Sequence, residues 1–162
     1  MSKYAYNYKP TQEEINNAWG ILSLTGKTEI TFELGFYGQS EDEQLDKISS
    51  LIRSMNSFNN KCNVTIAGQF KDFFKSLPRV QYGEGNPNNG NALFDKIILR
   101  GDDTIIFRAN GFNKNFEQYD WVDITRWIEK VGEEFWKADE SRLLYRDCGG
   151  GFSEYTIRFW WD

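Results

Sequence analysis

Two kinds of apolar spacing alternate along this chain of 162 residues, and they restrict its fold more than any other feature. Several stretches repeat apolar residues every three or four positions, which is typical of a helix with one buried face. Other stretches alternate apolar and polar residues, which is typical of a strand with one buried face. The pattern therefore predicts a domain in which helices and strands follow one another and pack together.

Two of the expected helices begin with recognisable capping boxes. Thr11-x-x-Glu14 and Ser40-x-x-Glu43 each place a hydroxyl and a carboxylate where they can bond the free N–H groups of a helix start. Pro78 ends a third apolar run. We expect helices near residues 11–24, 41–56, 70–77 and 120–137.

The helix expected over residues 120–137 has the most regular spacing, because its apolar positions follow steps of 3, 4, 3 and 4. These positions are Trp121, Ile124, Ile128, Val131 and Phe135. Asp120 precedes them as the expected N-cap. On a regular α-helix, Trp127 and Trp136 fall roughly 80–100° to either side of this stripe. Each tryptophan then either packs on another element or remains partly exposed.

Strands are expected at residues 30–36, 62–66, 92–99, 104–108, 143–146 and 155–161. Turn-forming residues at 100–103 and 149–151 predict that the last four strands form two hairpins. The polar segments 83–91 and 111–115 predict loops. Because no repeat or linker divides the chain, we expect a single α+β domain over residues 1–162. Its sheet should be mixed or largely antiparallel, with about four helices packed on it.

The chain contains no histidine, which narrows the chemistry open to it. Histidine is the usual group for proton transfer near neutral pH and the commonest metal ligand. Catalytic triads and histidine-bound metals are therefore excluded. Carboxylate pairs such as Glu129 with Glu133 could serve a hydrolase or hold magnesium. Since Arg126, Lys130 and Lys137 lie among these acids, a salt-bridged surface with an i,i+4 pair between Glu133 and Lys137 is the favoured interpretation.

Three further motifs favour structural interpretations. The spacing Gly85-x-x-x-x-Gly90 lacks the Lys-Ser/Thr pair of a phosphate-binding loop, and Arg100-Gly101-Asp102 fits a hairpin turn. Cys62 and Cys148 have no second thiol or histidine nearby, so they are expected to be reduced thiols, although a disulfide between them stays open. We expect no cofactor and no metal site.

The net charge is −5, from 24 acidic and 19 basic residues, which disfavours direct binding to nucleic acid or to an anionic membrane. No apolar segment has the length of a signal peptide or a membrane span, so an intracellular, cytoplasmic protein is expected. The densest acidic cluster lies at 41–46. It either stabilises a helix start through the helix dipole or also attracts a basic partner.

Aromatic residues are abundant, with 13 Phe, 8 Tyr and 6 Trp. Such side chains build cores and also anchor interfaces. Trp160 and Trp161 are adjacent on an expected strand, so they should face opposite sides of the sheet. The alternating Tyr4, Tyr6 and Tyr8 form either an edge strand or an arm that docks on another protein.

Acidity, surplus aromatic residues and missing catalytic groups together favour a protein that acts by occupying another protein's surface. The leading hypothesis is a stoichiometric inhibitor of a basic, nucleic-acid-handling protein, such as a phage product directed against a CRISPR or restriction nuclease. The alternatives are a toxin-neutralising immunity protein, a carboxylate- or magnesium-dependent enzyme and a structural or assembly protein. The expected partner-binding residues are Glu41, Asp42, Glu43, Asp46, Trp127, Glu133, Glu134, Trp136, Asp139 and Glu140.

Overall fold

The described residues form a single α+β domain built on a five-stranded antiparallel sheet with the order β1-β2-β3-β5-β4. The structure is a computed structural model that describes residues 29–34, 41–54, 62–79, 92–100 and 103–162. The strands are β1 (Glu29–Glu33), β2 (Lys96–Arg100), β3 (Thr104–Phe112), β4 (Glu140–Gly149) and β5 (Phe152–Trp160). The predicted fold class and both predicted hairpins, β2–β3 and β4–β5, are confirmed.

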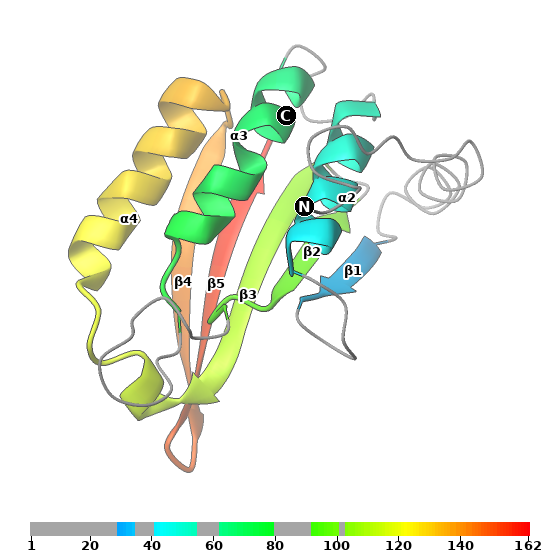
Figure 1. Cartoon of the computed structure of the whole chain (residues 1–162). Helices are drawn as coiled ribbons and strands as arrows, with labels where there is room; N and C mark the ends of the chain where they lie inside the picture. The colour runs from blue at the N-terminus through cyan, green and yellow to red at the C-terminus, as the bar shows by residue number, and fades with distance from the viewer. Residues whose placement is uncertain (1–28, 35–40, 55–61, 80–91, 101–102) are drawn as a thin grey trace.

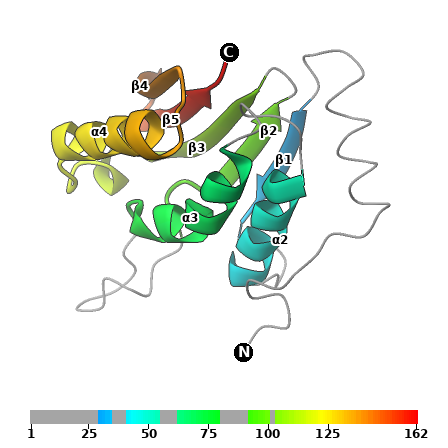
Figure 2. The ribbon, with the colours of Figure 1, turned by 90° about the horizontal axis from the view of Figure 1, so that it is seen from above.

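All the α-helices that the structure describes lie on one side of this sheet (Figures 1 and 2). They are α2 (Glu41–Ser54), α3 (Asn63–Ser76) and α4 (Trp121–Lys130), and α4 continues into a π-helical turn, η2 (Val131–Phe135). A short 3-10 turn, η1 (Asn113–Asn115), follows β3. Three α-helices are thus described where about four were expected. The expected helix over 11–24, the expected loop over 83–91 and Tyr4, Tyr6 and Tyr8 lie outside the described residues.

The core lies between the helices and the sheet. Alternate residues of the central strands point toward the helices, because successive side chains of a strand face opposite sides. The fully buried strand residues of the core are Ile97, Leu99, Ile105, Phe107, Ala109, Ile157 and Phe159. The helices cover them chiefly with Leu45, Ile48, Ile52, Ile66, Phe70, Phe73 and Phe74. Trp161 is buried in this core whereas Trp160 is only partly buried, in accord with their expected opposite faces.

The predicted strand over 62–66 is wrong, because Asn63–Ser76 is the helix α3. Cys62, Val64 and Ile66 alternate in type, but Val64 is exposed while Ile66 is buried beside Ala67. From Ile66 onward, the buried residues Ile66, Phe70 and Phe73 follow one another at steps of four and three, which gives the helix one buried face. Asn63 further ties the helix start to α2, because its side-chain amide donates to the carbonyl oxygen of Ile52 at 2.9 Å.

The helix predicted over 120–137 forms, with a change of geometry near its end. The Asp120 carboxylate accepts from the backbone N–H groups of Val122 and Asp123, which confirms the predicted N-cap. The α-helix ends at Lys130, and the next turn is π-helical. The loop expected over 111–115 begins later than predicted, since β3 continues to Phe112.

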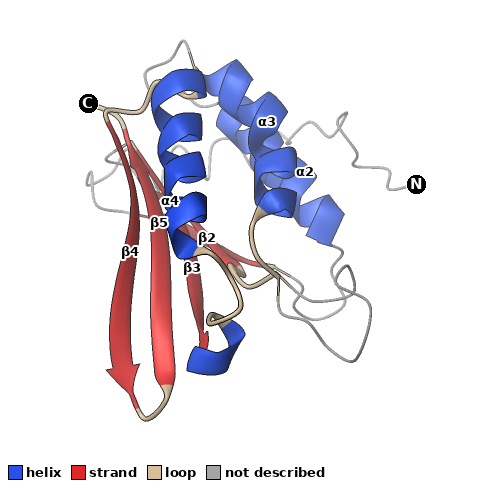
Figure 3. Ribbon diagram, turned by 90° about the vertical axis from the view of Figure 1, so that its left-hand side faces the viewer, coloured by secondary structure: helices blue, strands red, loops and turns tan. Residues whose placement is uncertain are grey.

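No described helix or strand covers the second face of the sheet, which we call the open face (Figure 2). The β4–β5 hairpin also extends past the end of α4, so its turn projects beyond the helical layer (Figure 3). None of the helices that the structure describes is long and apolar enough to span a membrane.

Candidate functional site

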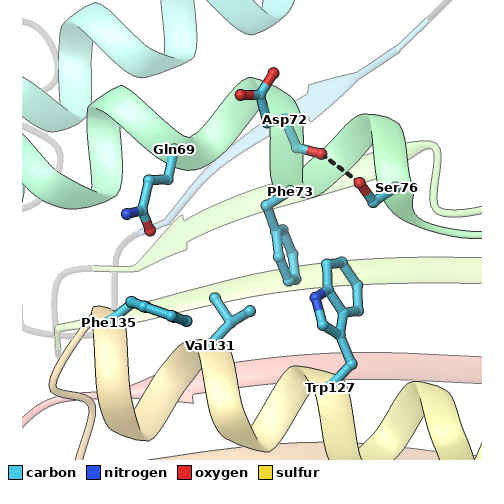
Figure 4. A pocket seen from close by; sticks show the side chains of 7 residues that line it. All are labelled: Gln69, Asp72, Phe73, Ser76, Trp127, Val131 and Phe135. Atoms are coloured by element: carbon cyan, nitrogen blue, oxygen red, sulfur yellow. Dashed lines mark hydrogen bonds between the residues drawn. The ribbon is translucent and has the colours of Figure 1, made fainter.

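An apolar groove separates α3 from α4 and η2. Its volume is about 240 Å³, and it is lined by Gln69, Asp72, Phe73, Ser76, Trp127, Val131 and Phe135. Figure 4 shows Phe73, Trp127 and Val131 pointing toward one another from α3, α4 and η2, whereas the Asp72 carboxylate points away from them. The indole of Trp127 stacks on the Phe73 ring, with 4.8 Å between centroids and 18° between planes. Phe135 is 47% exposed, so it presents an aromatic surface to solvent at this groove.

The π-helical turn decides which aromatic residue faces the groove. In η2 the backbone N–H of Trp136 donates to the carbonyl oxygen of Val131 at 3.0 Å, one residue further along than in an α-helix. The extra residue carries Trp136 into the core and turns Phe135 outward. The stripe predicted from Trp121 to Phe135 is therefore wrong at its last position, since a regular α-helix would have buried Phe135.

Trp136, expected as a partner-binding residue, is fully buried. Its indole N–H donates to the side-chain oxygen of Gln69 at 2.9 Å, and its carbonyl oxygen accepts from the indole of Trp161 at 2.8 Å. These bonds fix it inside the domain, so it is not available to a partner. Trp127, the other tryptophan expected at an interface, lies at the groove and remains partly exposed.

The acidic cluster at the start of α2 faces basic residues of α3 and Arg79, which follows that helix. Glu41 forms ion pairs with Arg79 and Lys75, and Asp42 pairs with Lys75 at 2.6 Å. Hydrogen bonding to the Lys75 ammonium lowers the pKa of Asp42 below its ordinary value. Asp46 is only 3% exposed and pairs with Lys71 at 3.2 Å. Asp46 is thus too buried to contact a partner, and the cluster joins two helices instead of forming a free acidic patch.

Glu43 lies on α2 and is half-buried, and the other four expected residues lie between η2 and the start of β4. Glu133 and Glu134 are exposed on η2, immediately before Phe135. Asp139 is exposed and accepts from the backbone N–H of Asp162 at 2.6 Å. Glu140 lies on β4, where it pairs with Arg142 and Arg158. The structure therefore places Trp127 at the groove, Glu133 and Glu134 on η2 next in sequence to Phe135, and Glu140 on β4.

The ion pair expected between Glu133 and Lys137 does not form among the described residues. Lys137 lies beyond the end of η2 in a left-handed backbone conformation, with φ of 53°, so the helical i,i+4 geometry is lost. Cys62 is buried and Cys148 is exposed, and both are free thiols. Within the described ranges, no group of three or more Cys, Asp or Glu side chains is arranged to hold a metal ion.

The open face carries a second hollow, of about 310 Å³, which the sequence patterns did not predict. It is lined by Arg100, Ile106, Arg108, Leu144, Tyr145, Arg146, Glu154, Thr156 and Arg158. A local signal was present, because Lys96 and Arg100, and likewise Arg142 and Arg146, are four residues apart and so fall on the same face of a strand, and the segment 156–158 adds one further arginine. Strand alternation puts such residues on one face, but only the strand order brings the three segments together.

No protein-family model, no curated protein and no solved structure matches this chain.

Proposed function

We propose that this protein acts by binding a basic protein through the groove between α3 and α4 and thereby blocking that protein's function. The observation that carries the proposal is the pair of exposed aromatic surfaces at this groove, Phe135 and Trp127. Aromatic side chains are enriched among the residues that dominate binding energy at interfaces. Phe135 stands outward because of a π-helical turn, a local irregularity that is frequent at functional sites.

The charges near the groove favour a basic occupant. Asp72 belongs to the α3 side of the groove with its carboxylate directed away from Phe73 and Trp127 (Figure 4). Glu133 and Glu134 precede Phe135 on η2, and all three acidic side chains are exposed. An apolar side chain of the partner would lie against Phe135 and Trp127, and flanking Lys or Arg side chains would meet these carboxylates. Rim charges of this kind raise the association rate, whereas the buried apolar anchor slows dissociation. Nucleases and other nucleic-acid-handling proteins present suitable basic surfaces.

An affinity capture with matched variants tests this proposal. The parent, Phe135→Ser and Val122→Ser would be used as baits in a lysate of the native host, followed by mass spectrometry. Val122 is 62% exposed on α4 and does not line the groove, so it controls for the loss of an exposed apolar residue. We expect the parent and Val122→Ser to retain one basic protein that Phe135→Ser loses.

The captured protein would then be purified and titrated. We expect stoichiometric loss of its activity with the parent, and a loss of about 2 kcal/mol or more of binding free energy with Phe135→Ser, the range of an interface hot spot. Circular dichroism must first show that the variants are folded. If folded Phe135→Ser binds and inhibits like the parent, the groove is not the interface; if the protein turns over a substrate, the inhibitor proposal is overturned.

A further inference from the structure

The open face of the sheet is basic, although the chain as a whole is acidic. Strand alternation and register place six basic residues on it: Lys96, Arg100, Arg108, Arg142, Arg146 and Arg158. The acids whose side chains the structure describes on the same face are Glu33, Glu140 and Glu154. The described side chains of this face therefore sum to +3, whereas the net charge of the whole chain is −5. The net charge of the chain therefore combines a basic sheet face with an acidic remainder.

The register sets like charges against one another across the strands. Arg108 on β3 lies opposite Lys96 on β2, and Arg158 on β5 lies opposite Arg142 on β4. Directly opposed like charges destabilise an antiparallel pair. Glu140 relieves the second pair by contacting both arginines. Glu33 lies opposite Lys96 on β1, and Glu154 pairs with Arg146 at 3.3 Å, so acids offset part of the charge. The six bases still outnumber the described acids, which suits an anionic ligand.

Arg108, on β3, is one of the arginines that line the hollow on this face. Its Nε is buried, and no hydrogen-bond partner is found for it among the described residues. Ile106, next to Arg108 on the same face, is only 4% exposed although it lies outside the main core. Arginine stems can cover apolar surface in this way while their guanidinium groups stay available. Guanidinium groups bind phosphate with paired hydrogen bonds.

An exposed aromatic pair lies at one end of the same face. Phe112 on β3 and Phe152 on β5 are register partners, with ring centroids 4.4 Å apart. They are 51% and 43% exposed, and the Lys114 ammonium lies 5.8 Å from the Phe112 ring. From Phe152 to Trp160 the strand spans about 27 Å at ~3.4 Å per residue. Aromatic rings and guanidinium groups are thus distributed along an extended surface.

We infer that the open face binds single-stranded nucleic acid, with the arginines on the phosphates and the Phe112–Phe152 pair stacking against a base. Positive surfaces that interleave arginine with aromatic side chains bind single strands without strict sequence preference, because every base has a flat face. An acidic peptide would use the arginines but would leave the phenylalanine pair without a partner. A duplex keeps its bases stacked inside the helix, so it would not use the pair either. The inference is independent of the groove and of the function proposed for it.

Fluorescence anisotropy of the full-length protein with labelled 15-nucleotide oligo(dT) tests the inference. We expect saturable binding that weakens with salt, with a log–log slope of about −0.7 for each phosphate contacted. Arg108→Gln should weaken binding about tenfold and make the slope shallower by about 0.7. Arg126→Gln is the matched control, because it removes the same charge from an exposed site on α4 and should change affinity far less.

The aromatic contribution is tested by the double variant Phe112→Ser with Phe152→Ser. We expect it to weaken oligo(dT) binding about tenfold, in the range of base–aromatic stacking. The affinity for inorganic polyphosphate, which has no bases to stack, should stay unchanged. Ultraviolet crosslinking of the parent to oligo(dT), read by mass spectrometry, should place the link within 104–112 or 152–160 and does not depend on the folding of any variant.

Four outcomes would overturn the inference. They are an absence of binding to oligo(dT) at low salt, equal losses with Arg108→Gln and Arg126→Gln, crosslinks confined to the helices, and tighter binding of oligo-glutamate or duplex DNA than of oligo(dT). Tighter binding of oligo-glutamate would assign the face to an acidic protein. Phe135 lies on the opposite side of the sheet, so a failure here would not affect the groove proposal.

Discussion

Gly132 has the closest packing among the described glycines, where η2 meets the sheet. A Cβ added there would lie 1.7 Å from Oγ and 2.6 Å from Cβ of Ser141, and 2.9 Å from the Phe159 ring. The Ser141 Cβ is attached directly to the backbone of β4 and cannot move far. We therefore expect Gly132→Ala to destabilise the fold by roughly 1–3 kcal/mol, as overpacking does in other cores.

Gly68 provides the matched control for this prediction. It lies in α3 with nothing within 4 Å of an added Cβ, so Gly68→Ala should stabilise the protein by roughly 0.5–1 kcal/mol through helix propensity. Urea unfolding followed by circular dichroism measures both changes. Equal effects of the two substitutions would show that Gly132 does not pack on β4 as described.

At the scale of elements, the sequence predicts most helices and strands but not the places where two patterns compete. Residues 62–66 satisfy a strand pattern, yet the helical stripe that starts at Ile66 decides the structure, because its buried face has the sheet to pack on. The π-helical turn could not be predicted either. The turn is accompanied by the close fit of Gly132 against Ser141 on β4 and by the bond from Trp136 to Gln69 on α3, and both contacts are to other elements of the fold.

The ion pairs between α2 and α3 make stability depend on pH. The pKa of Asp42 is lowered from its ordinary value of 3.8, first because the Lys75 ammonium hydrogen-bonds to the carboxylate. The folded protein therefore binds this proton less readily than the unfolded chain. The resulting stabilisation is present above about pH 3.8 and disappears as the pH falls through the lower folded-state value.

We expect Asp42→Asn to reduce the loss of stability between pH 6 and pH 3 relative to the parent. Urea midpoints measured across this range test the difference. Lys75→Met should have the same effect, because it removes the other member of the pair. Glu134→Gln removes an exposed carboxyl outside the α2–α3 pair and serves as the control. A parent and an Asp42→Asn variant with parallel pH profiles would contradict the assignment.

At the scale of the whole molecule, strand order produces what no local pattern contains. Arg108 and Arg158 are fifty residues apart in sequence, and their face becomes continuous because β3 lies beside β5. On the helical side of the sheet, three acids of α2 form ion pairs with Lys71 and Lys75 of α3 and with Arg79, which follows α3. Composition alone therefore indicated an acidic protein with acidic binding residues. The folded chain instead separates an aromatic groove with acidic neighbours from a basic sheet face.

An aromatic cluster centred on Phe73 connects the helical layer to the sheet. The Phe73 ring lies 4.8 Å from that of Trp127, 4.9 Å from Trp136, 5.2 Å from Phe107 and 5.6 Å from Phe159. These partners belong to α4, to the end of η2, and to β3 and β5. A single side chain on α3 thus contacts α4, the residue after η2 and two strands of the sheet. We therefore expect the helical layer and the sheet to unfold together.

We expect Phe73→Ala to cost about 3–5 kcal/mol of unfolding free energy, the range for removing a buried phenylalanine. Far-ultraviolet circular dichroism and near-ultraviolet aromatic dichroism should shift to the same lower urea midpoint, because the cluster joins the helices to the sheet. Phe112→Ala, which removes a half-exposed ring, should cost much less. Two separate transitions in the parent would mean that the helical layer and the sheet are independent units. A small effect of Phe73→Ala with one transition would instead place the main contact between the layers at another residue.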